Sequence, residues 1–267
     1  MPDLLGSLPE NVSTYGADID SLYHLILYIT AGAFFLVQGC LVVFLWRYRA
    51  GASKKAIYTH GNARLEVAWT AVPSLILVFL GFMSRGLWAH IKMDMPPPDV
   101  TIMVTGKQFN WEILYPGPDG KFHTEDDYQV DNDMRVPVNK VVRVLLGSHD
   151  VIHSFFVPQA RLKQDALPGR EIPAWFEITK PGIYEIPCAE LCGFGHSGMK
   201  GQLTVLSDAD YQAWLKEQWP PPGQAAPPPA GEGGAPAGET APPASGAAPP
   251  AGQAPPNGQQ APPTGQS

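Results

Sequence analysis

Two cysteines, a histidine and a methionine lie within the segment Cys188–Met199, at the spacing C-x3-C-x3-H-x2-M. Thiolate, imidazole and thioether are the soft or borderline ligands that copper prefers, whereas magnesium and calcium prefer oxygen. A second imidazole stands upstream, at His153 in the stretch DVIHSFFVP. Together these side chains are sufficient to hold two copper ions.

One cysteine, two histidines and a distant methionine form a mononuclear blue-copper site, but this chain offers a second cysteine. Two thiolates can each bridge two copper ions, so that the metals share one electron. Each ion then takes one imidazole, from His153 or His196, and Met199 is a weak axial ligand to one of them. The backbone carbonyl of Glu190 can fill the other axial position. Because a shared electron changes each bond length little, such a centre suits electron transfer.

Three other interpretations of the cysteines stay open at this point. A disulfide between Cys188 and Cys192 suits an oxidising compartment, but it leaves His196 and Met199 without a role. A zinc site is disfavoured because methionine is a poor structural zinc ligand. A copper carrier or chaperone would hold a single ion with the C-x3-C pair and would leave Met199 unexplained.

The chain resembles subunit II of the haem–copper cytochrome c oxidases over roughly residues 20–215. Asp150–Pro158 is similar to the family's first ligand loop, Lys163–Arg170 to the segment that lies against subunit I, and Pro181–Tyr184 leads into the highly specific second ligand loop. The resemblance implies a dinuclear copper centre called CuA, and it also implies that the Glu190 side chain contributes to a magnesium site shared with subunit I. The implied copper ligands are His153, Cys188, Glu190 through its carbonyl, Cys192, His196 and Met199.

The family receives electrons at an aromatic stretch, Gln-Trp-Tyr-Trp, which matches positions 108–111 here. Phe109 replaces the exposed first tryptophan, and Asn110 replaces the tyrosine. This departure favours a donor other than the usual soluble cytochrome c, such as a membrane-bound haem complex. Trp111 is retained, and a buried core tryptophan explains it at least as well.

Three charged residues outside the centre receive roles from the resemblance. Asp165 and Arg170 are expected to contact subunit I near the haem propionates, although ordinary loop charges would look the same. Glu66 is expected at the mouth of a proton channel into subunit I, although a carboxylate there also suits the helix dipole. An acidic run after the aromatic stretch either steers a basic partner or is a solvated loop; it comprises Asp119, Glu125, Asp126, Asp127, Asp131 and Asp133.

Two apolar segments, Leu22–Trp46 and Val67–Ala89, are each long enough to cross a bilayer. We therefore predict a transmembrane hairpin over residues 22–92, with helices at about 22–46 and 67–91. A buried core helix is a poor explanation for two such segments in one small chain.

The charges around the hairpin set its orientation. Residues 1–21 carry acidic side chains and no lysine or arginine, and they are expected to form an external segment without a cleavable leader. By the positive-inside rule the loop between the helices is cytoplasmic, so both termini and the copper domain lie on the outer side. This predicts a multi-pass protein of the bacterial inner membrane with a periplasmic copper domain. The basic residues of the loop are Arg47, Arg49, Lys54, Lys55 and Arg64.

After Val100, short runs rich in valine, isoleucine and aromatic residues are separated by glycine and proline, which predicts a β-sandwich or barrel. The resemblance implies a cupredoxin-like Greek-key barrel, which we place at residues 93–219 with a terminal helix at Tyr211–Trp219. Loops at one end of such a barrel would hold the ligands rigidly. Residues 220–267 are dominated by proline, alanine, glycine and glutamine and are predicted to be a disordered tail.

The chain is therefore interpreted as the electron-transfer subunit of a proton-pumping terminal oxidase. Its copper pair would pass electrons from a cytochrome c-type donor to the haem of subunit I, where oxygen is reduced to water, and this chain would hold no catalytic residue of its own. The expected partners are subunit I with its haem and CuB, subunit III, the donor and membrane lipid; no nucleic acid is expected.

Three alternative functions compete with this interpretation. A nitrous oxide reductase lacks the two helices, and a quinol oxidase subunit lacks the copper ligands. A membrane-anchored copper carrier is the non-enzyme alternative, and it differs by holding one copper ion instead of two.

Overall fold

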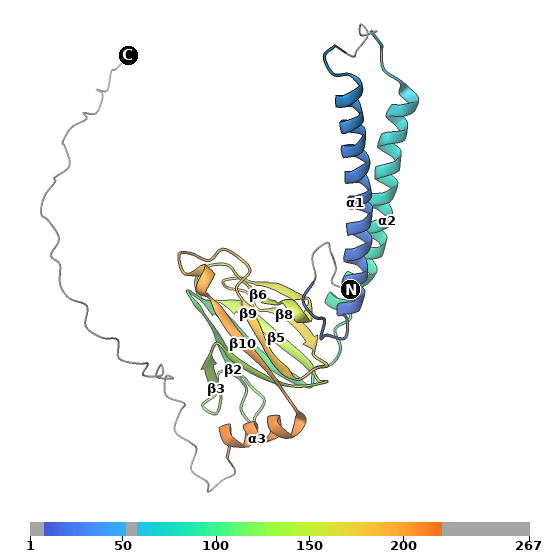
Figure 1. Cartoon of the computed structure of the whole chain (residues 1–267). Coiled ribbons are helices and arrows are strands. Elements are labelled where there is room, and N and C mark those ends of the chain that lie inside the picture. Colours follow the sequence, from blue (N-terminus) through green and yellow to red (C-terminus); the bar gives the residue numbers. More distant parts are fainter. Residues whose placement is uncertain (1–7, 52–57, 221–267) are drawn as a thin grey trace, which may run out of the picture. The chain divides into compact units, whose positions relative to one another are not determined.

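The computed structural model of the chain describes residues 8–51 and 58–220 (Figure 1). The predicted tail from residue 221 onward and two of the basic loop residues, Lys54 and Lys55, lie outside the described residues.

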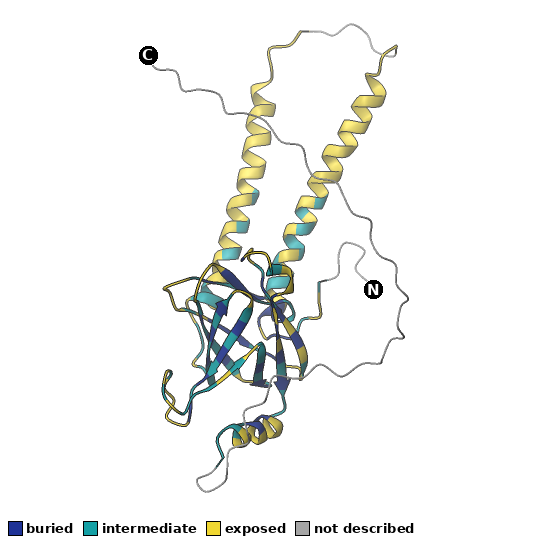
Figure 2. Ribbon diagram, turned by 90° about the vertical axis from the view of Figure 1, so that its left-hand side faces the viewer, coloured by how far each residue is buried: buried dark blue, intermediate teal, exposed yellow. Residues whose placement is uncertain are grey.

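Two long helices precede the β-domain. Helix α1 spans Gly16–Arg47 and helix α2 spans Ala63–Lys92, and the long apolar stretch of each helix is not buried within the chain. Figure 2 draws both helices mostly in the colour of exposed residues. At about 1.5 Å per residue, each helix exceeds the roughly 30 Å of a bilayer core. Their apolar surfaces therefore require lipid or other membrane-embedded chains around them.

Both helices begin earlier than the apolar pattern predicts, at Gly16 and Ala63, because polar residues start them. The side chain of Asn62 accepts hydrogen bonds from the backbone N–H groups of Arg64 and Leu65, at 3.0 and 3.3 Å, and so caps α2. Asp18 lies in the first turn of α1, where a negative charge is favourable. Hydropathy locates the spanning segments, whereas polar residues at the N-terminal end of each helix, including the Asn62 cap of α2, extend the helices beyond them.

The β-domain contains three sheets. Strands β3-β2-β1-β5-β8 form a five-stranded sheet, β4-β10-β9 a three-stranded sheet, and β6-β7 a two-stranded one. The β1–β5 and β4–β10 pairs are parallel, and the other pairs are antiparallel. The strands are β1 Val100–Lys107, β2 Asn110–Tyr115, β3 Tyr128–Asp131, β4 Asp133–Pro137, β5 Val141–Ser148, β6 His153–Val157, β7 Leu162–Ala166, β8 Ile172–Glu177, β9 Gly182–Pro187 and β10 Lys200–Leu206.

The core of the domain lies between the two larger sheets. Val104 and Val144 of the five-stranded sheet and Ile186 and Leu203 of the three-stranded sheet are completely buried. Inward-facing residues alternate with partly exposed ones along β1, β2 and β5, as expected for strands that cover a core on one face. The predicted fold class, two apolar helices followed by an all-β cupredoxin-like domain, is confirmed.

Three short helices complete the domain: the single turns η1 (Pro158–Ala160) and η2 (His196–Gly198), and the helix α3 (Asp208–Gln218). The last one begins before the predicted Tyr211 because Ser207 caps it, accepting from the backbone N–H of Asp210 at 3.2 Å.

The segment before α1 is attached to the β-domain, which the sequence did not predict. Ser13 forms a β-bridge with Ile178, and the backbone of Val12 bonds to Gln159 and Thr179 at 3.0 and 2.8 Å. The Trp175 indole N–H also donates to the carbonyl of Ile91 at 2.8 Å, near the end of α2. The β-domain is thus bonded to the segment before α1 and to the last turn of α2.

Arg161 holds the segment before α1 and the first turns of α1 against the β-domain. Its replacement is therefore expected to destabilise the chain. The Arg161 side chain is 8% exposed, and its guanidinium lies 2.7 Å from the Asp20 carboxylate and also donates to the carbonyls of Pro9 and Pro158. The Arg161→Ala change would leave the Asp20 carboxylate without its partner, so we expect a loss of about 2–3 kcal/mol in the free energy of unfolding.

Urea unfolding of the detergent-solubilised chain, followed by tryptophan fluorescence, measures this loss. Lys140→Ala is the matched control, because Lys140 lies 3.7 Å from Asp99 with both side chains 45% exposed; it should cost less than about 1 kcal/mol. Equal losses for the two variants would contradict the assignment of Arg161 as the anchor.

Candidate metal centre

The ligands predicted from the sequence come from two segments at one end of the β-domain. His153 is the first residue of β6, and the loop 188–199 joins β9 to β10. Backbone hydrogen bonds close this loop: Cys188 N–H donates to Met199 O, and Ala189 N–H donates to Ser154 O, both at 3.0 Å. The second bond connects the loop to the strand that carries His153.

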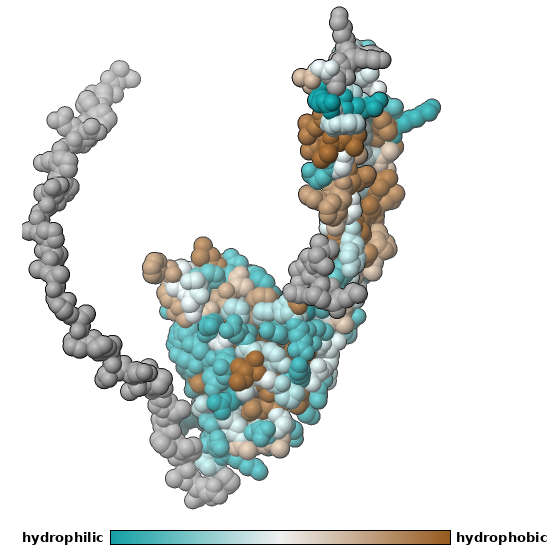
Figure 3. All heavy atoms as spheres, viewed as in Figure 1, coloured by the Kyte–Doolittle hydropathy of each residue, from teal (hydrophilic) through white to brown (hydrophobic). Residues whose placement is uncertain are grey.

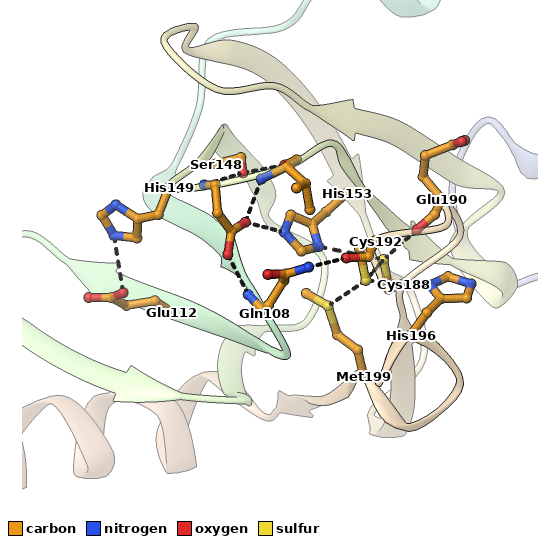
Figure 4. Close-up of polar contacts among 12 residues, drawn as sticks. Gln108, Glu112, Ser148, His149, His153, Cys188, Glu190, Cys192, His196 and Met199 are labelled. Atoms are coloured by element: carbon orange, nitrogen blue, oxygen red, sulfur yellow. Dashed lines mark hydrogen bonds and ion pairs between the residues drawn. The ribbon is translucent and has the colours of Figure 1, made fainter. Parts of the chain in front are cut away.

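The structure brings all of these ligand groups together (Figure 4). The sulfur atoms of Cys188 and Cys192 are 3.9 Å apart, and both cysteines are free. A disulfide bond would be close to 2.05 Å, so the structure does not contain the alternative Cys188–Cys192 disulfide. The Cys188 sulfur is 3.9 Å from His153 Nδ1 and 3.2 Å from the Glu190 carbonyl oxygen. The Cys192 sulfur is 3.6 Å from His196 Nδ1 and 3.7 Å from the Met199 sulfur.

Asp150 fixes the orientation of the His153 ring. Its carboxylate lies 2.8 Å from His153 Nε2, which leaves Nδ1 directed at the Cys188 sulfur. Burial opposes ionisation of Asp150, but the hydrogen bonds from His153 and from the backbone N–H groups of Gln108 and Val151 prevail and lower its pKa to about 2. A carboxylate on the far nitrogen of a histidine is the usual support of a metal ligand. Asp150 therefore holds His153 in the way that a carboxylate supports a metal-binding histidine.

Burial makes the two thiols dependent on a positive charge. Cys188, Cys192 and Met199 are almost inaccessible to water. Burial, together with the neighbouring Cys188 sulfur, raises the pKa of Cys192 to about 11. Two adjacent thiolates in this site therefore require bound cations to balance them. Soft donors, a supported imidazole and this need for positive charge all fit copper.

Of the two aromatic residues expected to receive electrons, Phe109 lies at the surface and Trp111 lies in the core. Phe109 is 39% exposed, and its ring lies against the ligand loop, so that a Cβ atom on Gly195 would be only 2.5 Å from it. Trp111 is completely buried, donates its indole N–H to the carbonyl of Ile186 at 3.1 Å, and lies edge-to-face against His153. Of these two aromatic residues, Phe109 is therefore the one that reaches both solvent and the loop.

The charged residues expected at the partner surface are partly or fully exposed. Asp165, on β7, accepts a 2.7 Å hydrogen bond from Ser154, the neighbour of His153. Arg170 and Glu190 are exposed, and Glu66 is exposed in the first turn of α2.

The acidic run predicted after the aromatic stretch lies mostly away from the ligands. Asp119–Asp127 follows Tyr115, whereas the other end of β2 carries Trp111, next to His153. The carbonyl of Asp126 accepts from the Trp219 indole beside α3, which Figure 1 places at the end of the domain away from the orange ligand loop. This part of the run does not border the centre.

Sequence reasoning missed two residues that shape the site. The sequence marks Asp150 only as the start of the segment Asp150–Pro158, although its position three residues before His153 is a signal for its supporting role. Gly106 packs against the His153 ring, and a Cβ atom there would be 2.8 Å from it. No local pattern marks that glycine, because the contact joins two strands far apart in the sequence.

Comparisons with known proteins match both the helical part and the β-domain of the chain. Residues 5–87 match the transmembrane domain of cytochrome c oxidase subunit II, and residues 116–205 match its periplasmic domain. Cytochrome c oxidase subunit 2 of Cereibacter sphaeroides is 34% identical over 238 residues, with 78% of each chain covered. The corresponding protein of Thermostichus vulcanus is 32% identical, with 79% of this chain and 78% of the relative covered.

Among solved structures, the periplasmic domain of subunit II of cytochrome oxidase from Bradyrhizobium japonicum is 38% identical and covers 46% of this chain and 94% of its own, with a TM-score of 0.41. The two domain matches together span more than half of the sequence, on both sides of the link between helices and β-domain. By these matches and by its relatives, the chain belongs to the cytochrome c oxidase subunit II family.

Proposed function

We propose that this chain receives electrons at a dinuclear copper centre and passes them to the haem of subunit I. As a member of its family it is an electron-transfer subunit of a haem–copper oxidase, with two transmembrane helices and a periplasmic domain. The observation that carries the finer proposal is a pair of free, buried cysteines 3.9 Å apart, each within 4 Å of a different histidine. When bound, the copper pair takes up and releases one electron at a time. The proposed ligands are His153, Cys188, the Glu190 carbonyl, Cys192, His196 and Met199.

The protein's own contribution is to hold these ligands rigidly in place. Asp150 holds one imidazole, and the Gln108 side-chain amide donates to the carbonyl of Cys192. Turn hydrogen bonds within the loop, from His196 N–H to Gly193 O and from Met199 N–H to His196 O, restrain its far end. Because these bonds join groups of the protein to one another, a change of charge at the centre should move the ligands little.

Electrons are proposed to enter through Phe109 and to leave toward subunit I on a different side. Phe109 suits the first role because it is partly exposed and packs on the ligand loop; Trp111 suits support of His153 from within the core. Asp165 and Arg170 are proposed to contact subunit I, and the Glu190 side chain is proposed to share a magnesium ion with it. The electron donor is proposed to be a c-type cytochrome or a membrane-bound haem complex.

Glu66 is proposed to stand at the mouth of a proton channel into subunit I. A helix cap is the competing explanation, but Asn62 already accepts the N–H groups of the first turn. The Glu66 carboxylate is therefore available for another role. In this arrangement the Glu66 end of α2 is cytoplasmic, both termini are periplasmic, and the chain lies in the bacterial inner membrane with lipid, subunit I and subunit III around its helices.

Copper content and electron paramagnetic resonance test the centre. The full chain, purified in detergent and loaded with copper, should bind two copper ions and give a seven-line hyperfine pattern from one electron shared over two nuclei. One copper ion with a four-line pattern would contradict the proposal and would favour the copper carrier.

A further inference from the structure

A cleft opens between the two membrane helices at the end of the hairpin that adjoins the β-domain. Its volume is about 400 Å³, and it lies between the first turns of α1 and the last turns of α2. Figure 2 shows half-buried residues of both helices gathered toward this end. We call it the hairpin cleft. Its lining includes Asp18, Ser21 and Leu25 of α1 and Met83, Leu87 and His90 of α2.

The lining of the hairpin cleft changes from polar to apolar with depth in the membrane. On α1, Asp18 and Ser21 precede the apolar segment that starts at Leu22, and on α2, His90 follows the apolar segment that ends at Ala89. In Figure 3 the brown surface of the helices gives way to paler residues toward the β-domain. On each helix the lining extends about 10 Å, at about 1.5 Å per residue. Its polar end therefore lies at the level of the lipid headgroups, and its leucines lie at the level of the acyl chains.

The other charged side chains at this end of the helices are engaged elsewhere. Asp20 lies 2.7 Å from Arg161, and the Lys92 ammonium donates to the Gln164 side chain on β7. Arg85 is two positions away from each of the two apolar lining residues of α2, and side chains two positions apart on a helix do not share a face. None of these charges is therefore directed into the cleft.

Two uncharged polar groups near the cleft are bonded to the backbone of α1. The Ser21 hydroxyl and the His24 imidazole each bond to the carbonyl four residues earlier, at 2.8 and 2.7 Å. The cleft therefore presents one carboxylate, Asp18, and one exposed imidazole, His90, above an apolar floor.

This combination of groups fits a phospholipid whose headgroup carries an ammonium. The carboxylate attracts the ammonium, an imidazole N–H donates to the phosphate, and the leucines receive the start of an acyl chain. A lipid with a phosphate and no ammonium would bring only negative charge to the Asp18 carboxylate, and the two would repel each other. The cleft should therefore distinguish lipids by the charge of their headgroups.

We propose that the hairpin cleft binds an aminophospholipid of the periplasmic leaflet, with the ammonium on Asp18 and the phosphate on His90. The leaflet follows from the periplasmic β-domain, which adjoins this end of the hairpin. The site is separate from the metal centre and does not depend on the function proposed for that centre. A helix of subunit I is the competing occupant, but it would need a groove along the roughly 30 Å of the bilayer core. The cleft extends only about 10 Å, which suits a headgroup and the beginning of an acyl chain.

The test is native mass spectrometry of the full chain in detergent and, in parallel, of the holo-oxidase. Dioleoyl-phosphatidylethanolamine and dioleoyl-phosphatidylglycerol are added at equal concentration, and the wild type should retain the ethanolamine lipid in preference. Asp18→Asn should weaken binding of that lipid about fivefold, the effect of one charge beside a lipid headgroup. Asp18→Lys should reverse the preference in favour of the glycerol lipid, a gain that a misfolded chain could not give. Leu87→Ser should weaken both lipids alike, because it removes apolar floor.

Asp94→Asn is the matched control. Asp94 is an exposed carboxylate just beyond the end of α2, outside the lining of the cleft, so its replacement should keep the wild-type affinity and preference. Equal binding of the two lipids by the wild type, or unchanged binding in Asp18→Asn, would overturn the proposal. So would a wild-type holo-oxidase that takes up no ethanolamine lipid although the separate chain does, because that result would assign the cleft to subunit I.

Discussion

Replacing Cys192 by serine is expected to abolish the shared-copper signal and to lower oxygen consumption driven by reduced cytochrome c by at least about a hundredfold, or about 3 kcal/mol. Cys192 lies at the middle of the ligand set: its sulfur is 3.9 Å from the Cys188 sulfur, 3.6 Å from His196 Nδ1 and 3.7 Å from the Met199 sulfur. A hydroxyl is a hard oxygen donor and cannot replace the soft bridging sulfur.

Serine has nearly the same shape as cysteine, so the fold should survive the change. Urea unfolding of the copper-free chain should therefore stay within about 1 kcal/mol of the wild type, while copper content and the resonance spectrum change. Cys40→Ser is the control, because Cys40 is exposed on α1, far along the chain from the ligands. Two copper ions with a retained seven-line pattern in Cys192→Ser would show that Cys192 does not bridge the metals.

The ligand loop was predictable because most of its chemistry is local. Cys188, Cys192, His196 and Met199 fall within a single loop, so their types and spacing in the sequence already identify copper as the preferred metal. The two helices were predictable for a similar reason, since a membrane span needs about 20 consecutive apolar residues. In both cases one short segment of the chain contains the whole physical signal.

The groups that fix the geometry were not predictable, because they act between distant segments. The hydrogen bond from the Gln108 backbone N–H to the Asp150 carboxylate, and the packing of Phe109 on Gly195, join three loops that only the fold brings together. The same holds for Ser13, whose β-bridge to Ile178 attaches the start of the chain to the β-domain. Neither propensity nor periodicity encodes such contacts, since each depends on the order of strands in the sheets.

Helix boundaries and the acidic run show a second kind of limit. Asn62 and Ser207 decide where α2 and α3 begin, but a capping residue resembles any other polar loop residue until the helix beyond it is placed. From the sequence alone, the carboxylates of Asp119–Asp127 look like a docking surface. The fold places that loop beside α3, because β2 carries the chain away from the ligands before the run begins.

Gly106→Ala is expected to displace His153 and to weaken copper binding about 10- to 100-fold, the usual effect of losing the support of a metal ligand. A Cβ atom at Gly106 would lie 2.8 and 2.9 Å from His153 Cδ2 and Cγ, closer than side chains pack. The ring has little freedom to move, because Asp150 holds its Nε2 and Trp111 packs against it edge-to-face. Overpacking of this kind should also cost about 1–3 kcal/mol in the free energy of unfolding.

Gly147→Ala separates this steric effect from the general cost of changing a strand glycine. Gly147 lies on β5, paired with Thr105 directly beside Gly106, yet its Cβ atom would meet nothing closer than the carbonyl oxygen of Arg170 at 3.4 Å. We therefore expect Gly147→Ala to keep normal copper affinity and to change stability by less than about 1 kcal/mol. Copper titration and urea unfolding of both variants measure the difference. If the two alanine variants bound copper equally well, Gly106 would not be the residue that leaves room for the His153 ring, and the ligand geometry would have to tolerate a shift of that imidazole.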